Sequence, residues 1–250
     1  HDDALVALRT HAAAQADAGA LHLDIRFTGS VDAIRALNEG RCTLAGFHTV
    51  EHPAADSLTA RTYKPLLQPG LHKIIGFAQR TQGLIVAPGN PLGLGSLADV
   101  ARTGARFLNR PLGTGTRVLL DDLLAQAGME AQAIRGYALN EPSHTAIAQA
   151  VAAGAADVGM GIEVAARARG LDFVPLVHER YHLACLKASL DQPATLALRN
   201  LLQTPEWLAQ MATLPGYSPW QCGEVQAMNT VLPWWQFTRK KRTSEPRKKP

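Results

Sequence analysis

The hydrophobic and polar positions of the chain predict repeated strand–helix units. Residues 21–27 alternate in strand fashion, and residues 42–47 form a second apolar, strand-like run. Between them, Ser30 is a suitable cap for a short helix that ends at Gly40. The order recurs later, with strands predicted at 106–109, 134–137 and 157–160 and helices at 116–127 and 143–153. Such alternation is typical of mainly parallel sheets covered by helices, in which ligands bind beyond the carboxyl ends of the strands.

Two long extended segments, residues 74–87 and 173–186, interrupt this alternation, and each has polar residues at its middle. Strands of this length can leave one sheet and enter another, so we place two crossings between domains there. We therefore expect a discontinuous α/β domain of residues 1–79 and 181–238. Residues 80–180 would form an inserted α/β domain.

Composition supports an ordinary globular chain with a basic end. Of the 250 residues, 46% are hydrophobic and 18% are charged, enough for one large domain or two small ones. The formal net charge is +4, but residues 239–250 hold seven Lys or Arg and one Glu, a net of +6, so the rest carries −2. We expect residues 239–250 to be a disordered basic tail, with weak contact to DNA or acidic partners as the alternative.

Several classes of site and location are disfavoured by the sequence. Three widely spaced cysteines indicate neither a zinc site nor a disulfide framework. The scattered histidines His48, His52, His144, His178 and His182 lack metal-binding spacing, and Ser143 lacks the glycines of a nucleophile elbow. We therefore expect no metal, no cofactor and no enzymatic activity. No apolar stretch approaches the roughly 20 residues of a membrane span, so we expect a cytoplasmic protein without a membrane partner.

Four loops that each precede a helix predict the binding site: residues 1–3, 28–30, 113–117 and 142–145. Each brings hydroxyl or backbone N–H donors to the amino end of a helix, where unpaired amides and the helix dipole attract an anion. Ser30 and Ser143 could instead be simple N-caps, and Gly113 and Gly115 could merely permit a turn. If the strands lie as predicted, the four loops face one another across a cleft between the domains.

Two arginines, one in the third loop and one just before it, bear on the ligand. Arg117 stands in the first turn of a helix, where its charge opposes the dipole unless an anion is shared there, so we expect it to contact the ligand. The alternative is a solvent-exposed arginine on an amphipathic helix. Arg110 is less clear, because Pro111 restricts it to an extended conformation and it could pair with Asp121 or Asp122 instead.

The motifs resemble those of a known family. They are Gly29-Ser30 with the apolar pattern of residues 33–48, the segment 82–91, the block Asn109-Arg110-x-x-Gly113-x-Gly115-Thr116-Arg117, residues 144–159 with Ala156-Asp157-Val158-Gly159, and residues 173–181. Together they are similar to the periplasmic-binding-protein-like domain found behind helix-turn-helix DNA-binding modules and in molybdopterin-biosynthesis fusions. The resemblance covers about residues 1–220. It extends more weakly to solute-binding proteins for tungstate and molybdate.

This resemblance implies a type II periplasmic-binding-protein-like fold, in which two α/β domains enclose a ligand cleft. It also implies a sensing role, with a small oxyanion such as molybdate or tungstate as the effector of a transcriptional regulator. A small organic acid or a pterin-type ligand is the alternative. The family has a Gly-Ser-His-Asp loop after a first strand, whereas this chain opens at His1-Asp2. We therefore expect that strand and an upstream DNA-binding domain to be missing from this chain.

The expected ligand-binding residues are His1, Asp2, Thr28, Gly29, Ser30, His48, Thr114, Gly115, Thr116, Arg117, Ser143, His144 and Tyr181. A buried dianion needs nearly every oxygen satisfied, so we expect these donors to a tetrahedral dianion: Ser30, Thr114, Thr116, Arg117, Ser143 and the backbone at Gly115. His48 and Tyr181 would pack against an organic ligand. The aromatic residues Trp220, Trp234, Trp235 and Phe237 would pack the last segment or form the self-association surface of a homodimer.

Overall fold

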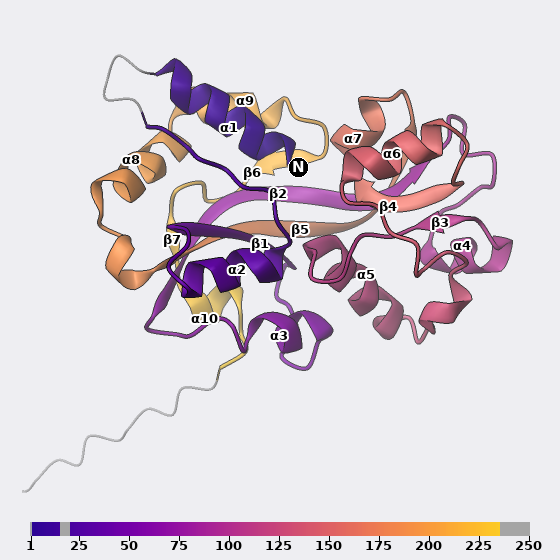
Figure 1. The fold of residues 1–250 in the computed structure, drawn as a ribbon, viewed down its shortest axis with the longest axis horizontal. Helices are drawn as coiled ribbons and strands as arrows, with labels where there is room; N and C mark the ends of the chain where they lie inside the picture. Colours follow the sequence, from indigo (N-terminus) through magenta and orange to yellow (C-terminus); the bar gives the residue numbers. More distant parts are fainter. Residues whose placement is uncertain (1, 16–20, 236–250) are drawn as a thin grey trace, which may run out of the picture.

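The computed structural model describes residues 2–15 and 21–235, which fold around one seven-stranded sheet with helices on both faces (Figure 1). The strands are β1 (Leu44–Val50), β2 (His72–Val86), β3 (Phe107–Leu108), β4 (Val158–Ile162), β5 (Asp172–Leu186), β6 (Tyr217–Pro219) and β7 (Val225–Gln226). The α-helices are α1 (Asp3–Ala14), α2 (Ser30–Asn38), α3 (Leu58–Tyr63), α4 (Leu97–Thr103), α5 (Gly115–Gln126), α6 (His144–Ala152), α7 (Glu163–Arg167), α8 (Pro193–Leu202), α9 (Pro205–Ala212) and α10 (Met228–Val231).

The long strands β2 and β5 form the middle of the sheet, whose order is β1-β5-β2-β4-β3. They pair with each other in antiparallel fashion over nearly their whole length, with register shifts after Gly76 and after Gln82. On its other side β2 pairs with β6 and β7 as far as Arg80, and with β4 from Gln82 onward. The second neighbour of β2 therefore changes at the polar middle of the strand.

The predicted elements are confirmed in part. The structure has both long strands, and β3, α5, α6 and β4 each start within one residue of the predicted position. The expectation of a mainly parallel sheet was wrong. Among the described strands, β3 with β4 is the parallel pair, and the remaining pairs are antiparallel.

Two predicted strands do not join the sheet. Residues 134–137 follow a short 3-10 helix and lie in a turn. Residues 21–27 have no strand pairing. Their alternation is real, since Leu21 and Leu23 pack against a hydrophobic cluster while His22 and Asp24 are exposed. A half-buried extended segment gives the same alternation as a half-buried strand.

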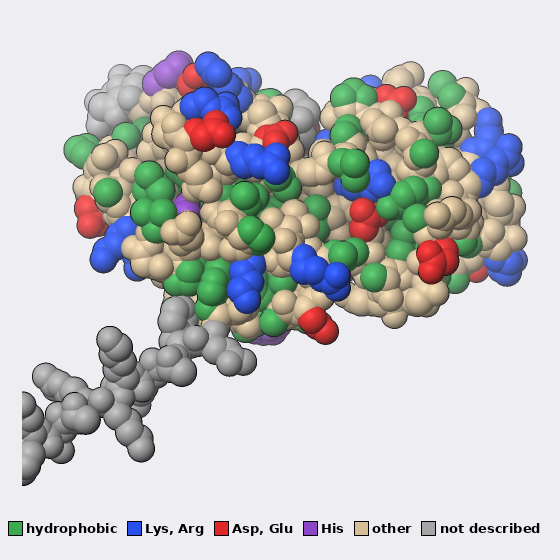
Figure 2. Space-filling model, turned by 60° about the horizontal axis from the view of Figure 1, so that its bottom comes forward, with side chains coloured by type: hydrophobic (Ala, Val, Ile, Leu, Met, Phe, Trp, Pro, Cys, Tyr) green, Lys and Arg blue, Asp and Glu red, His purple; other side chains and the backbone are tan. Residues whose placement is uncertain are grey.

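The core is divided among three clusters of buried side chains. The largest lies on the face of the sheet that α1, α6, α7, α8 and α9 cover, and includes Phe77 and Trp207 (Figure 1). On the opposite face, a second cluster joins α2, α3 and the α10 segment around Phe47, and a third joins α4 and α5 to β3 and β4 around Phe107. In the space-filling view the outline narrows between the two halves of the molecule (Figure 2). The predicted domain limits near residues 80 and 180 fall at the middle of β2 and β5, and stay a prediction.

The end of the described chain is packed. Trp234 is buried in the second cluster and donates a hydrogen bond from Nε1 to the backbone oxygen of Pro53 (3.0 Å), and Trp235 packs beside it. Phe237 and the predicted basic tail of residues 239–250 lie outside the described residues. Within residues 2–15 and 21–235, no helix has both the length and the apolar character to cross a membrane.

Candidate functional site

Four helix starts surround one cavity of about 100 Å³. Asp2 caps α1, Gly29 precedes α2, Thr114 caps α5, and His144 is the first residue of α6. The lining residues are Asp2, Leu5, Arg26, Phe27, Thr28, Gly29, Ser30, Ala33, Gly46, His48, Arg80, Arg110, Thr114, Gly115, Thr116, His144 and Tyr181. The structure thus brings together ten of the thirteen predicted residues. His1 lies outside the described residues.

The loops before α2 and α5 approach each other closely. The backbone N–H of Val31 donates to the backbone oxygen of Gly113 (3.2 Å), and a Cβ added to Gly29 would lie 2.8 Å from that same oxygen. A Cβ on Gly115 would lie 3.0 Å from Ser30 Oγ. Glycine is therefore required at 29 for the contact between the loops, and at 115 to leave space beside Ser30. The cap of α2 is Gly29 rather than Ser30, so α2 has no side-chain cap.

Two predicted donors do not line the cavity. The Arg117 guanidinium lies over the Tyr137 ring (4.2 Å), and its Nε donates to both carboxylate oxygens of Asp121 (3.1 Å each). The cost of a cation in the first turn is thus offset by a carboxylate one turn later rather than by a ligand. Ser143 Oγ accepts from the N–H of Ala146 (3.0 Å) and is the N-cap of α6, as its alternative interpretation had it. The expectation that these two side chains face the ligand is corrected accordingly.

Arg110, rather than the predicted Arg117, brings its side chain to the cavity. It lines the cavity and is only 8% exposed, yet no carboxylate of the described residues lies within ion-pair distance of it. Its Nη1 donates to the backbone oxygen of Glu141 (2.9 Å), while its buried Nε–H has no acceptor among the described residues. Burial, and then the charge of Arg80, lowers the pKa of Arg110 to about 10. A buried cation without a counter-charge has the chemistry to bind an anion.

The suggested pairing of Arg110 with Asp121 or Asp122 is absent. Asp121 accepts from Arg117 and from the Tyr137 hydroxyl (2.6 Å). Asp122 accepts from the backbone N–H groups of Leu58 (2.8 Å) and Thr59 (3.0 Å) at the start of α3, and from the Thr59 hydroxyl. Both carboxylates are therefore occupied away from the cavity.

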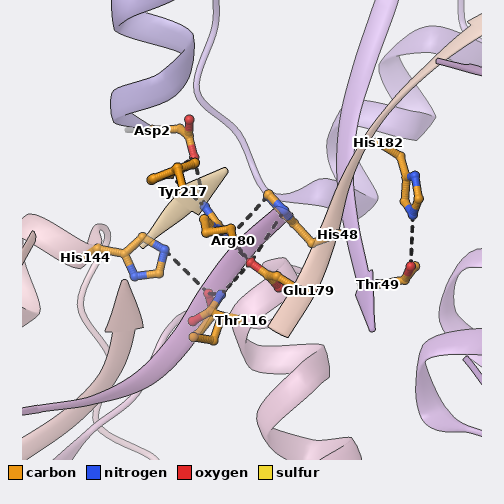
Figure 3. Close-up of polar contacts among 10 residues, drawn as sticks. Asp2, His48, Thr49, Arg80, Thr116, His144, Glu179, His182 and Tyr217 are labelled. Atoms are coloured by element: carbon orange, nitrogen blue, oxygen red, sulfur yellow. Dashed lines mark hydrogen bonds and ion pairs between the residues drawn. The ribbon is translucent and has the colours of Figure 1, made fainter. Parts of the chain in front are cut away.

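Arg80 also lines the cavity, but its guanidinium is paired with carboxylates of the protein (Figure 3). Its Nε donates to Glu179 Oε1 (2.5 Å), and its Nη1 donates to Asp2 Oδ2 (2.8 Å). The Tyr217 hydroxyl donates to the same oxygen of Asp2 (2.8 Å). Although burial alone would lower it, the carboxylate of Glu179, then the Tyr217 hydroxyl and the carboxylate of Asp2, raise the pKa of Arg80. We call Asp2, Arg80, Glu179 and Tyr217 the Arg80 cluster.

The two histidines at the cavity are held neutral. Arg80 Nη2 lies 3.3 Å from His48 Nε2, and because a guanidinium only donates, this nitrogen accepts and the ring proton is on Nδ1. Burial, then the charge of Arg80, lowers the pKa of both His48 and His144 well below the usual value. Thr116 Oγ1 accepts from Gln82 Nε2 (2.8 Å) and lies 3.5 Å from His144 Nε2 (Figure 3).

Residues that the sequence interpretation missed come mainly from the strand centres. Arg80 and Glu179 stand opposite each other in β2 and β5, inside the polar middles of two otherwise apolar segments. Opposite charges at the centre of two buried strands predict a buried ion pair, so this signal was present in the sequence. Arg26 and Phe27 beside Thr28 also line the cavity, and nothing in their local pattern indicates it. Within the described ranges, no three His, Cys, Asp or Glu side chains are placed to hold a metal ion.

Four helix starts and a buried cation around one small cavity are typical of a binding domain. A model of the PBP superfamily domain matches residues 11–203. The chain belongs to this superfamily. Its members are binding and sensing domains, and the mixed sheet with helices on both faces has the type II form of the fold. The resemblance seen in the motifs is thereby confirmed at the level of the family.

One relative by sequence and two solved structures can be compared with the chain. The chain is 30% identical over 200 residues to the uncharacterized protein YvgK of Bacillus subtilis. The matched region covers 80% of this chain and 64% of YvgK, so this chain spans less than two thirds of that relative's length. The tungstate ABC transporter protein of Geobacter sulfurreducens superposes with a TM-score of 0.61 at 13% identity, over 84% of this chain and 93% of that one. The effector-binding domain of QuiR in complex with shikimate gives 0.58 at 16% identity, over 79% and 87%. Identities this low establish the fold alone.

Proposed function

We propose that the cavity binds a small oxyanion such as molybdate or tungstate, and that Arg110 is its principal charged contact. The observation that carries this proposal is a buried guanidinium with an unpaired Nε–H at the wall of a cavity. Keeping such a cation out of water is costly unless an anion compensates it. The starts of α2, α5 and α6 around the same cavity add partial positive charge and backbone donors.

The size of the cavity limits the ligand. Its volume of about 100 Å³ is well below the roughly 300 to 1,000 Å³ of sites for drug-sized ligands. A pterin-type ligand is therefore disfavoured, while a tetrahedral oxyanion or a small organic acid fits. Ser30, Gly115 and Thr116 are the proposed donors beside Arg110, because they bring hydroxyl and amide groups from α2 and α5 to the cavity, whereas the Thr114 hydroxyl donates to the backbone oxygen of Pro111 (2.8 Å).

A small organic acid is the second candidate, and a specific feature favours it. Leu5, Phe27 and Tyr181 give the cavity an apolar side, against which the body of a carboxylic acid could pack while Arg110 binds the carboxylate. The superposition on a shikimate-binding effector domain is compatible with this alternative, as that on a tungstate transport protein is with the first. Both candidates share the same anion contact.

As the wider role, we propose effector sensing in the cytoplasm as part of a transcriptional regulator that includes a DNA-binding domain. The ligand would be enclosed where β2 exchanges β6 for β4 and the pairing of β5 with β1 ends, and a change in how the two halves close would carry the signal to a partner. Homodimer formation belongs to this proposal. These finer statements go beyond the family membership, which supports ligand binding without naming the ligand.

The test is a ligand screen by thermal unfolding, followed by calorimetric titration of every hit. The panel holds tungstate, molybdate, sulfate, phosphate, shikimate and a set of small monocarboxylic acids. A ligand at 100 times its dissociation constant should add about 2.7 kcal/mol of stability, which for a chain of this size raises Tm by roughly 5 to 10 °C. Tungstate or molybdate binding more tightly than the carboxylates supports the first candidate, and the reverse order supports the second. If no anion shifts Tm, the proposal is refuted.

A further inference from the structure

The formal charges at the cavity cancel before any ligand binds. Arg80 and Arg110 contribute two positive charges, and Asp2 and Glu179 contribute two negative ones, all from side chains less than 10% exposed. Arg26 also lines the cavity but is exposed. Helix starts add only about half a positive charge each. A dianion that enters this site therefore brings more negative charge than the buried groups compensate.

We propose that Glu179 takes up a proton when a dianion binds, so that this carboxyl group sets the ligand charge that the pocket accepts. The proposal rests on the proposed function, because it concerns the anion bound beside Arg110. A monoanion would bind without the proton, whereas a dianion would bind together with it. Glu179 does not line the cavity itself, and acts on the ligand through the field of the Arg80 cluster.

The surroundings of Glu179 suit this role. The side chain is 1% exposed and receives Arg80 Nε (2.5 Å) and Gln82 Nε2 (3.1 Å), both from β2, on the same oxygen, Oε1. From β1, His48 Nδ1 lies 3.6 Å from this oxygen. Asp2, before α1, lies on the far side of the Arg80 guanidinium and adds negative charge. Tyr63 of α3 and Tyr181 of β5 are the nearby phenols.

The pKa of Glu179 is already raised in this place. Burial raises the pKa of Glu179, and the charge of Arg80 only partly opposes the rise. A further negative charge in the cavity acts in the same direction as Asp2, which also raises it. An anion in the cavity would therefore increase further the proton affinity of a carboxyl group that burial has already raised.

The other titratable groups at the cavity are less suitable. A proton on His48 Nε2 would face the Arg80 guanidinium 3.3 Å away. His144 is opposed by the charges of both Arg80 and Arg110. Asp2 already accepts from Arg80, from Tyr217 and from the N–H of Leu5 (3.1 Å), and a protonated carboxyl group would lose part of these hydrogen bonds.

Tungstate is the probe for the test, because its own charge stays at −2 between about pH 7 and pH 9, so any pH dependence comes from the protein. Titration calorimetry in buffers of different ionisation enthalpy counts the protons bound with each tungstate. We expect net uptake of up to about one proton, and an affinity that rises by up to about tenfold for each unit of pH decrease. In the Glu179→Gln chain the uptake should vanish, and tungstate should bind more tightly than to the parent at the highest pH.

Asp121→Asn is the matched control, because this carboxylate also pairs with an arginine but lies outside the cavity lining. Proton uptake should be unchanged in it. Should Glu179→Gln fail to fold, difference infrared spectroscopy of the parent chain decides the question, since tungstate must then produce the band of a protonated carboxyl group. A missing band, or uptake that persists in folded Glu179→Gln, overturns the inference. Tungstate binding without any proton uptake overturns this inference alone, whereas no binding of any anion of the screen at any pH overturns the proposed function as well.

Discussion

Arg80 and Arg110 line the same cavity, yet the structure treats them in opposite ways. Arg80 stands in a strand shared by both halves of the molecule, and two buried carboxylates and a tyrosine surround it. Arg110 stands in a loop, with one backbone carbonyl and no carboxylate as partner among the described residues. The first arrangement is complete without a ligand and the second is not. A buried arginine therefore indicates a binding site only when its counter-charge is missing from the protein.

The largest expected effect is on folding, at Arg80. Replacing Arg80 by Met leaves Asp2 and Glu179 buried without their cation, which should lower the free energy of unfolding by about 3 to 5 kcal/mol. Urea unfolding at neutral pH measures this loss. Arg110→Met is the control, because removing an unpaired buried cation should leave the stability unchanged or raise it. Equal losses in the two variants would mean that Arg110 has a structural counter-charge after all.

The second effect is on binding, at Arg110. For a ligand identified in the screen, Arg110→Ala should weaken binding by about 2 to 4 kcal/mol, which corresponds to roughly 30- to 700-fold. Arg110→Lys should fall between the parent and Arg110→Ala, because the ammonium keeps the charge but not the planar set of donors. Calorimetric titration of both variants gives the values. An unchanged dissociation constant in Arg110→Ala would place the anion elsewhere in the cavity.

How far the sequence predicts this site depends on the range of the interactions involved. Helix starts are local features, so Thr114, Gly115 and Thr116 could be recognised from a few neighbouring residues. The partner of a buried charge is not local, because Arg80 and Glu179 are 99 positions apart and Arg80 and Asp2 are 78 apart. Arg117 and Arg110 look alike in the same loop, and only the folded positions of Asp121 and Tyr137 decide which one is neutralised.

The same limit applies to the fold. Both long strands and the elements β3, α5, α6 and β4 were predictable, because their apolar patterns are continuous. The direction of pairing was not, since it depends on which distant segment lies beside each strand. Residues 21–27 show this clearly, because their alternation reports one buried face and carries no information about a neighbouring strand.

A third effect separates stability from binding, at His182. This side chain is buried outside the cavity lining, 3.0 Å from Thr49 Oγ1 (Figure 3). Burial, then the charge of Arg180, lowers the pKa of His182 to about 3. The pKa of His182 in the folded chain lies below the unfolded value of about 6.5. The contribution of the neutral His182 side chain to the free energy of unfolding is therefore fully present above about pH 6.5. It is lost at up to about 1.4 kcal/mol per pH unit as the pH falls towards 3.

The measurement is urea unfolding of the parent and of His182→Gln between about pH 7 and pH 4.5. The free energy of unfolding of the variant should fall less steeply with decreasing pH, by up to about 1.4 kcal/mol per pH unit, which corresponds to one proton. His48 and His144 contribute to the slope in both chains. Ligand affinity at pH 7 should be the same in the two. Identical slopes would show that His182 is not the neutral, buried group that its surroundings indicate.

The smallest effect is expected at Arg117, the residue that the sequence first placed in the site. Its guanidinium is held by Asp121 and the Tyr137 ring, and its Nη1 donates to the backbone oxygen of Arg110 (3.4 Å). Arg117→Ala should therefore lower stability by about 1 kcal/mol, through the lost i,i+4 ion pair and the lost ring contact. Affinity should change by less than about 1 kcal/mol, because only the support of the Arg110 backbone is removed. Titration of Arg117→Ala beside Arg110→Ala gives the sharpest form of the comparison, since these arginines are seven positions apart and the protein supplies a carboxylate to Arg117 but not, among the described residues, to Arg110. A loss in Arg117→Ala as large as that in Arg110→Ala would mean that the Asp121 pair opens when the ligand binds, and that both guanidinium groups then face the anion.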